Sequence, residues 1–330
     1  MLDENRERAQ LAEMIWITGR AAHSGYDGEM NFDVESFSGL PVIGGGDVCG
    51  PDGCGPAEGA GTAGSTGTAE STGDADFAHP AIELSDGTSI PQLGFGTWRL
   101  TERDDDALAA ALETGYRHID TATVYKNEEM VGRVLGSSGL DGVYITTKIH
   151  PTDEREPAEV MAASLEALQV ERVNMWLLHN TSDRNVDIWR AMIEEQEKGH
   201  TASIGVSNLS IAEIDELIDA TGVAPVMNQF RLGLSLHDPE FVAALRERGI
   251  APEGYSPLRA TNLDDPHIID VAQNLDVDPA DVVIAWHMAK GYIVIPKSAT
   301  ASRIRSNAYA SRLTLSEQHI AQLDRMEWTA

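Results

Sequence analysis

The feature that most constrains the fold is an alternation of short apolar segments with longer amphipathic ones, which begins after Pro80 and repeats eight times. Short apolar runs are typical of buried strands, whereas apolar residues spaced three and four apart are typical of helices packed on a core. Strands that alternate regularly with helices indicate a parallel sheet. The predicted strands are Gln92–Gly96, His118–Ala122, Val143–Ile149, Val173–His179, Ser203–Ser207, Val226–Phe230, Pro252–Ser256 and Tyr292–Pro296.

Helices are predicted between these strands and after the last one. They are Asp105–Thr114, Glu128–Leu135, Ala158–Leu168, Val186–Lys198, Ile211–Ala220, Asp238–Arg248, Ile268–Asn274, Ala280–Lys290, Ala301–Tyr309 and Ser316–Met326. Eight strand–helix units in about 250 residues fit a (β/α)8 barrel. An open doubly wound sheet normally carries G-x-G-x-x-G after its first strand, but here Gly94-x-Gly96 leads to Arg99. We therefore predict an α/β fold, a (β/α)8 TIM barrel preceded by an N-terminal β-hairpin that turns at Asp86-Gly87.

The chain is predicted to divide near Pro80 into an acidic tail, residues 1–79, and a barrel domain, residues 80–330. The tail contains GTAGSTGTAESTGDAD, which has little apolar surface to bury and favours a mostly disordered segment, although the first twenty residues could form a short helix. Cys49 and Cys54 lie in this tail. We interpret them as incidental thiols, with a labile disulfide or a metal site shared across a dimer as the alternative. No metal site is predicted in the barrel.

The charge of the chain disfavours several classes of protein. With 53 acidic and 24 basic side chains the formal net charge is -29, whereas proteins that bind nucleic acid or anionic lipid need a basic surface. No apolar run reaches the roughly 20 residues of a membrane span, and no secretory signal is recognisable, so we expect a cytoplasmic protein. Lysine is scarce, 5 residues against 19 arginines. This composition resembles that of proteins from salt-loving cells, where salt screens charge repulsion; an ordinary acidic cytoplasmic protein is the alternative.

Polar side chains stand at or just after the predicted strand ends, where barrel enzymes carry their catalytic groups. They are Asp120, Tyr125, Lys148, His179, Ser207, Asn208, Gln229, Tyr255 and Lys297. Each alone has an ordinary structural interpretation, such as a helix cap or a rim residue. Lys148 is the most unusual, because strand interiors avoid unpaired charge. Together they are expected to converge on one mouth of the barrel.

Four of these residues suit the reduction of a carbonyl group. A tyrosine titrates near about 10, and we expect the ammonium of Lys148 to lower the pKa of Tyr125 by favouring its phenolate. Asp120 would keep Lys148 charged and oriented, and His179 would hold the carbonyl oxygen that Tyr125 protonates. Because no side chain supplies hydride, a nicotinamide cofactor is implied.

Several motifs in order along the chain carry a resemblance to a known family. They are LGFGTW (93–98), GYRHIDTATVYKNEEMVG (115–132), TTKIHP (146–151), LLH (177–179), IGVSN (204–208), NQ (228–229), YSPL (255–258) and IPKS (295–298). Together these motifs resemble the aldo-keto reductases over residues 81–327. The resemblance implies a barrel that binds NADPH without a Rossmann motif. It also implies that Tyr125 is the general acid, that Asp120 and Lys148 tune it, and that His179 orients the carbonyl.

The resemblance further implies a cofactor site along the mouth. Ser207, Asn208 and Gln229 would hold the nicotinamide carboxamide, and Tyr255 would stack on its ring. The 2′-phosphate and adenine would be held by residues of the last strand end and the next helix. The full implied set is Thr97, Ser207, Asn208, Gln229, Tyr255, Ser256, Leu258, Lys297, Ser298, Arg303 and Asn307.

Several positions depart from the family pattern. Asn180 stands where an aromatic residue commonly follows the catalytic histidine, and Asn174 replaces a common aspartate. Arg231 and Ser306 stand where acidic residues are frequent, and the long C-terminal loop of larger members is expected to be absent. A substrate pocket is predicted from Trp98, His150 and Asn180. Its two polar members favour small, polar carbonyl compounds over bulky aromatic ones, unless both side chains point into solvent and select nothing.

Taken together, the sequence predicts a monomeric NADPH-dependent reductase whose partner is a small-molecule carbonyl compound. The alternative from another class is a barrel that keeps the cofactor site but acts as a binding or regulatory subunit without turnover. The complete set of Asp120, Tyr125, Lys148 and His179 favours the enzyme.

Overall fold

The computed structural model describes residues 80–326. The expectations for the tail, for a helix in the first twenty residues and for Cys49 and Cys54 therefore lie outside the described residues, as do residues 327–330. The barrel lies in a compact unit that begins at Asp74. Everything below concerns the barrel.

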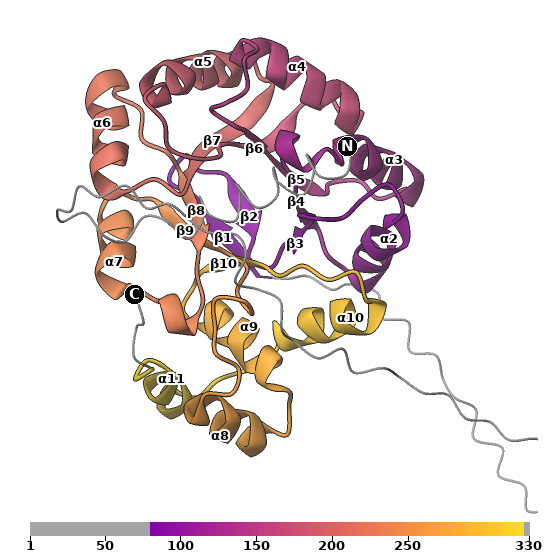
Figure 1. Ribbon diagram of the computed structural model, residues 1–330, viewed down its shortest axis with the longest axis vertical. Helices are drawn as coiled ribbons and strands as arrows, with labels where there is room; N and C mark the ends of the chain where they lie inside the picture. Colours follow the sequence, from indigo (N-terminus) through magenta and orange to yellow (C-terminus); the bar gives the residue numbers. More distant parts are fainter. Residues whose placement is uncertain (1–79, 327–330) are drawn as a thin grey trace, which may run out of the picture. The chain divides into compact units, whose positions relative to one another are not determined.

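Eight parallel strands form the central sheet, and each pairs with its neighbours in the order of the chain. The ring closes where the first and last strands meet, because Leu93 and Val294 form an isolated parallel bridge and the Gly94 N–H donates to the Val294 carbonyl at 2.9 Å. The predicted (β/α)8 barrel is confirmed (Figure 1). The strands are β3 (Phe95–Gly96), β4 (His118–Asp120), β5 (Tyr144–Ile149), β6 (Val173–Leu178), β7 (Thr201–Ser207), β8 (Met227–Arg231), β9 (Ala251–Tyr255) and β10 (Ile293–Ile295).

Helices follow the strands and surround the sheet (Figure 1). Two of them, α8 and α9, separate β9 from β10, and α11 comes last. Several begin at side chains that accept from the exposed backbone N–H groups of the first turn, as Ser210 does before α6 and Asp238 before α7. The bounds are α2 (Asp105–Thr114), α3 (Glu128–Ser138), α4 (Pro157–Leu168), α5 (Asn185–Glu197), α6 (Ile211–Thr221), α7 (Pro239–Glu247), α8 (Pro266–Leu275), α9 (Pro279–Ala289), α10 (Ala301–Ala310) and α11 (Glu317–Leu323), with the short 3₁₀ turns η1 (Thr123–Tyr125) and η2 (Leu234–Leu236).

The predicted hairpin, β1 (Ala81–Glu83) with β2 (Ser89–Pro91), covers one end of the barrel. Leu84 and Ile90 are buried and belong to the same apolar cluster as Tyr144, Met227 and Ile293, which are the first residues of their strands. The hairpin therefore packs on the N-terminal end of the barrel. The C-terminal end is left for a functional site, as in other barrels of this type.

Alternate residues of each strand point into the barrel, where space is limited. Gly94 and Gly96 lie where β3 approaches the last strand, and a methyl group on Gly94 would stand 2.8 Å from the side chain of Ile295. Lys148 on β5 points inward and is fully buried. The barrel interior is therefore tightly packed, and the charged side chain of Lys148 lies within it near the C-terminal end of β5.

Candidate active site

The structure brings together the four predicted catalytic residues at the C-terminal mouth. Asp120 ends β4, Lys148 lies one residue before the end of β5, His179 directly follows β6, and Tyr125 ends η1. β4 and β5 are hydrogen-bonded neighbours, with Asp120 opposite Thr146. The inward faces of these two strands therefore place Asp120 and Lys148 within reach of each other.

Asp120 and Lys148 form a buried ion pair with short contacts. The Lys148 Nζ donates to Asp120 Oδ1 at 2.6 Å, to Oδ2 at 2.8 Å and to the Thr121 carbonyl at 2.8 Å. Both side chains are almost completely shielded from solvent. Burial raises the pKa of the Asp120 carboxyl, and Lys148 and the amide of Gln229 oppose that rise. A buried pair of this kind is retained only when such contacts compensate the lost hydration of both ions.

Tyr125 stands next to the ion pair without sharing its strongest contacts. Its hydroxyl is 3.5 Å from Lys148 Nζ, which also lies 5.0 Å from the centre of its ring. Our expectation that Lys148 lowers the pKa of Tyr125 is wrong for this structure: burial, with the charges of Asp120 and Glu253, raises it well above its usual value. Burial is the largest cause of this rise. Tyr125 therefore keeps its proton, which is the state a general acid needs.

His179 faces Tyr125 across the mouth and is held neutral. The two ring centres are 5.7 Å apart in an edge-to-face arrangement. Burial lowers the pKa of His179 well below its usual value, and the positive charges of Lys148 and His150 act in the same direction. A neutral imidazole can still donate one N–H to an oxygen placed between it and Tyr125.

Two of the predicted pocket residues, His150 and Asn180, belong to a chain of hydrogen bonds that continues through Asn208 to Tyr255. His150 Nε2 lies 3.1 Å from Asn180 Nδ2, Asn208 Nδ2 donates to Asn180 Oδ1 at 3.0 Å, and the Tyr255 hydroxyl donates to Asn208 Oδ1 at 3.0 Å. His150 and Asn180 thus contact each other, and both side chains remain partly exposed. Trp98 stands apart from this chain, with the Arg99 guanidinium 4.3 Å from the centre of its ring.

Three residues of the expected cofactor site form hydrogen bonds at or near the ion pair in this structure. The Gln229 amide donates to Asp120 Oδ2 at 2.8 Å, and the Thr97 hydroxyl donates to the Asp120 carbonyl at 2.9 Å. Ser207 is buried, and its hydroxyl oxygen accepts from Asn208 Nδ2 at 3.0 Å. These contacts fix the first, fifth and sixth barrel strands relative to the catalytic centre.

The residues expected near the phosphates and adenine lie in the connection between β10 and α10 and on α10 itself. Lys297 and Arg303 are exposed, and neither forms an ion pair with a carboxylate of residues 80–326. Ser298 and Asn307 are buried. At the other strand ends, Asn208 and Ser256 have left-handed backbone conformations, with φ of 62° and 53°. Non-glycine residues adopt this conformation rarely, and it is concentrated at ligand-binding sites.

Leu258 and Ser306 differ from what their roles suggest. Leu258, expected at the cofactor, packs against the apolar cores on both sides of the β9–α8 connection. Ser306 stands where an acidic residue is frequent, but its hydroxyl donates to Asp281 Oδ1 at 2.8 Å. The Asp281 carboxylate on α9 therefore lies next to Ser306, the position at which the family often has an acidic residue.

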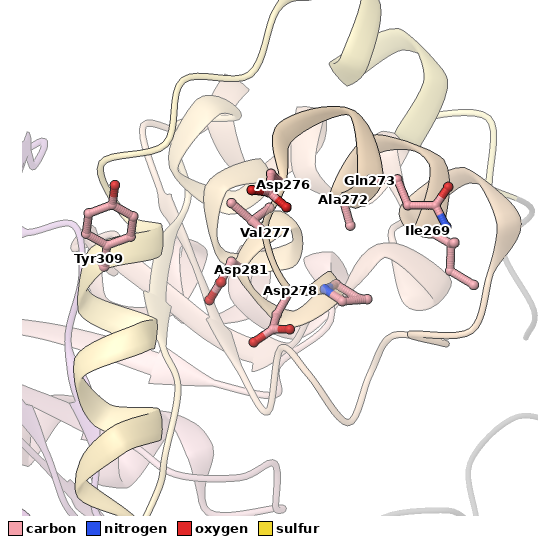
Figure 2. Close-up of a pocket in the computed structure, with 9 residues that line it drawn as sticks. Ile269, Ala272, Gln273, Asp276, Val277, Asp278, Asp281 and Tyr309 are labelled. Carbon is pink, nitrogen blue, oxygen red and sulfur yellow. The ribbon is translucent and has the colours of Figure 1, made fainter. Parts of the chain in front are cut away.

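A surface hollow lies away from the catalytic centre. It encloses about 590 Å³ between the α8–α9 connection and α10, and none of the predicted catalytic residues lines it. Figure 2 shows Tyr309 on α10 across from Asp276 and Asp281. Three aspartates in its wall make this hollow unfavourable for a phosphate.

Two residues that sequence reasoning missed belong to the centre. Asn127 is buried and holds the loop after β3, because its Nδ2 donates to the Thr97 and Leu100 carbonyls at 2.9 and 3.1 Å. Glu253 on β9 is fully buried in the barrel interior. A glutamate inside a predicted buried strand, two residues before Tyr255, was the available signal for it.

Within residues 80–326, no group of three or more His, Cys, Asp or Glu side chains is arranged to bind a metal ion. In the same part of the chain, every helix is too short or too polar to cross a lipid bilayer.

Comparison with known proteins gives a consistent family. The model of the aldo/keto reductase family matches residues 92–327. A protein named methylglyoxal reductase DkgA, from Yersinia pestis, is 38% identical over 257 residues, which cover 75% of this chain and 93% of that protein. A solved aldo/keto reductase from Brucella melitensis has a TM-score of 0.73 at 35% identity and covers 75% of this chain and 98% of its own. A variant of Gox0644 solved in complex with NADPH has a TM-score of 0.71 at 30% identity and covers 76% of this chain and 94% of its own.

Removing one partner of the buried ion pair should destabilise the fold strongly. Lys148→Met leaves the Asp120 carboxylate buried without its counter-charge, which we expect to lower the free energy of unfolding by about 3–5 kcal/mol. The double variant Lys148→Met with Asp120→Asn should lose less than the sum of the two single losses. Urea unfolding measures all three.

The matched control is Arg190→Met, because the ion pair of Arg190 with Asp187 is exposed on α5 and should contribute little. If Lys148→Met lowers the free energy of unfolding by no more than Arg190→Met does, the buried ion pair does not stabilise the fold as predicted.

Proposed function

This chain belongs to the aldo/keto reductase family, an oxidoreductase family, and we propose that it reduces an aldehyde or ketone to an alcohol with NADPH. The observation that carries the proposal is the convergence of Asp120, Tyr125, Lys148 and His179 at one mouth, with a protonated phenol beside a buried ion pair. In enzyme classification this is an NADP-dependent oxidoreductase acting on CH–OH donors, EC 1.1.1. A regulatory barrel without turnover would not require this set.

The residues at the mouth fit a dinucleotide with an additional phosphate. Lys297, just after β10, and Arg303, in the first turn of α10, are exposed cations that form no ion pair in the described part of the chain. The left-handed backbones at Asn208 and Ser256 indicate strand ends shaped for a ligand. Arg303, Lys297 and Ser298 would hold the 2′-phosphate, and Asn208, Ser207 and Gln229 the carboxamide. NADPH, when bound, supplies the hydride, and a similar structure was solved with it.

The chain's own residues would handle the proton. A carbonyl oxygen between Tyr125 and His179 would accept hydrogen bonds from the Tyr125 Oη and from the neutral imidazole. As negative charge develops on that oxygen, the proton at Tyr125 Oη moves to it. The resulting phenolate is stabilised by Lys148, 3.5 Å away, which Asp120 keeps charged. A cation that stabilises the phenolate lowers the pKa of Tyr125 by the same free energy, so Lys148 opposes the rise that burial causes without abolishing it.

The substrate is proposed to be small and polar. His150, Asn180 and Asn208 form a polar wall on one side of the mouth, where an aromatic wall is common in the family. Amide and imidazole groups can bond to an oxygen adjacent to the reacting carbonyl, and such sites discriminate against substrates that leave these groups unpaired. The similar Yersinia pestis protein is named for methylglyoxal, a compound of this kind.

Some expectations remain predictions. A monomeric state, a cytoplasmic location and a salt-loving source rest on composition alone. The separation of a tail at residues 1–79 from the barrel is proposed in the same way, as is the role of its cysteines.

Tyr125→Phe should retain NADPH binding and lose most turnover. The ring still fills its space, but the proton donor is gone, and a positioned acid typically contributes about 10²–10⁴-fold. NADPH oxidation with methylglyoxal measures turnover, and quenching of protein fluorescence measures cofactor binding. Turnover like that of the wild type would remove Tyr125 from the mechanism.

Arg303→Ala should weaken NADPH binding by roughly tenfold or more and leave NADH binding almost unchanged. The guanidinium pairs with the phosphate that only NADPH carries, and charge-assisted bonds of this type are strong. Titration with both cofactors measures the difference, with Arg305→Ala on the same helix as a control. An equal loss for both cofactors would contradict the assignment.

Asn180→Trp should shift preference from polar to aromatic substrates. The bulky ring removes the hydrogen-bonding wall, so kcat/KM should fall for methylglyoxal and rise relative to it for benzaldehyde, by roughly tenfold in their ratio. The ratio is compared in wild type and variant at saturating NADPH. If benzaldehyde is already preferred and the variant changes nothing, the pocket proposal is wrong.

A further inference from the structure

Glu253 is a buried acid that the mechanism above does not use. It lies on β9 with Gln229 of β8 opposite it on one side and Ile293 of β10 on the other. Its side chain is completely shielded from solvent. Neither carboxyl oxygen has a hydrogen-bond partner of normal geometry within residues 80–326, although the Gln229 amide lies near enough to favour the charged form. Such a group is rare in folded proteins and needs a physical explanation.

The neighbouring ion pair cannot neutralise a second carboxylate. The three short contacts of Lys148 Nζ go to the two oxygens of Asp120 and to the Thr121 carbonyl. Gln229, the register neighbour of Glu253, donates its amide to Asp120. An ionised Glu253 would therefore add an unpaired charge to the interior, which is costly where water is excluded. Burial and the charge of Asp120 raise the pKa of Glu253 to about 8, with Lys148 and Gln229 opposing the rise.

We propose, on the basis of the carbonyl reductase function above, that Glu253 holds a proton in the working enzyme and is a positioning residue that keeps a single ion pair behind Tyr125. When Glu253 loses this proton, a second negative charge stands beside Asp120 and stabilises the protonated form of Tyr125. Glu253 thereby links the proton affinity of the catalytic tyrosine to pH.

The groups that surround Glu253 determine the direction of this effect. Its charge acts on Tyr125 in the same direction as that of Asp120, because both raise the pKa of the phenol. It also raises the pKa of Tyr144, whose hydroxyl is buried without a hydrogen-bond partner among residues 80–326. Lys148 is the nearby cation. The titratable and charged groups that interact with Glu253 are Asp120 on β4, Lys148 and Tyr144 on β5, and Tyr125 on η1.

Alcohol oxidation, the reverse reaction, exposes the effect most clearly because it needs the phenolate of Tyr125 as a base. In the wild type, ionisation of Glu253 opposes formation of this phenolate as the pH rises. In Glu253→Gln the neutral amide cannot ionise, so the phenolate forms at lower pH. The rise of the oxidation rate with pH should therefore move down by about one pH unit, the order of shift that one nearby charge produces.

A second measurement does not depend on activity. In the folded chain the pKa of Glu253 lies near 8, above the ordinary value of 4.5, so the folded state binds the additional proton between these two values. The contribution of Glu253 to the stability of the wild type must then fall as pH rises from about 5 to about 8, and no further above that. The difference in Tm between Glu253→Gln and the wild type should grow over this interval and then stay constant.

Glu128→Gln is the matched control. Burial also raises the pKa of Glu128, but this residue lies on α3 outside the barrel and its carboxylate accepts from Thr147 at 2.6 Å. It can change the pH dependence of Tm, but it should leave the pH profile of alcohol oxidation where it is in the wild type. If Glu253→Gln does not fold, Glu253→Met removes the acid at similar volume and is measured in the same two assays.

The outcomes separate the inference from the proposed function. A Tm difference that does not vary between pH 5 and 8 would overturn the inference, as would an oxidation profile of Glu253→Gln that coincides with the wild type. Loss of turnover in Glu253→Gln at every pH, with NADP⁺ still bound, would also overturn it, since glutamine reproduces the neutral acid. If the wild type reduces no carbonyl compound, the proposed function fails, while the Tm difference still decides whether Glu253 holds the proton.

Discussion

The buried ion pair between Asp120 and Lys148 is the interaction on which the rest of the catalytic centre depends. An ammonium ion completely shielded from solvent is stable only if its donors are satisfied, and here a carboxylate and a backbone carbonyl do this at 2.6–2.8 Å. Each neighbour then has a position relative to that pair. Thr97 donates to the Asp120 carbonyl, and Gln229 donates to the Asp120 side chain. The Tyr125 hydroxyl lies 3.5 Å from Lys148 Nζ.

The electrostatic strength of this centre comes from the closed end of the barrel. The hairpin packs Leu84 and Ile90 against the first residues of the strands. It therefore covers the N-terminal end of the barrel, opposite the mouth. Charges in such an interior interact more strongly than at the surface, and each unpaired polar group there is costly. Burial in this interior keeps His179 neutral and Tyr125 protonated. It also favours the protonated form of Glu253.

The sequence predicts the barrel and the four catalytic residues because both follow from local patterns. The helix at Asp105–Thr114 is found with the bounds expected, whereas β3 is shorter than expected because Leu93 contributes only an isolated bridge. Electrostatics inside the barrel could not be predicted in this way. The pKa of Tyr125 depends on how completely the phenol is buried and on the charges of Asp120 and Glu253 around it, which only the packed structure shows. Glu253 had a sequence signal, its position two residues before Tyr255 in a buried strand, but the sequence does not show how completely its side chain is buried.

The charge of the whole molecule and the charge of the proposed cofactor have the same sign, which constrains the mouth. A net charge of -29 repels a dinucleotide phosphate unless cations near the binding site stay free of carboxylates. Lys297 and Arg303 form no ion pair with a carboxylate within residues 80–326, although Asp104 lies close enough to Lys297 to act on its charge. Arg99 and Arg259, which flank Trp98, form no such ion pair either. The repulsion from the whole surface acts over longer distances than the contact between a phosphate and a neighbouring cation, so salt reduces the repulsion more than the local attraction.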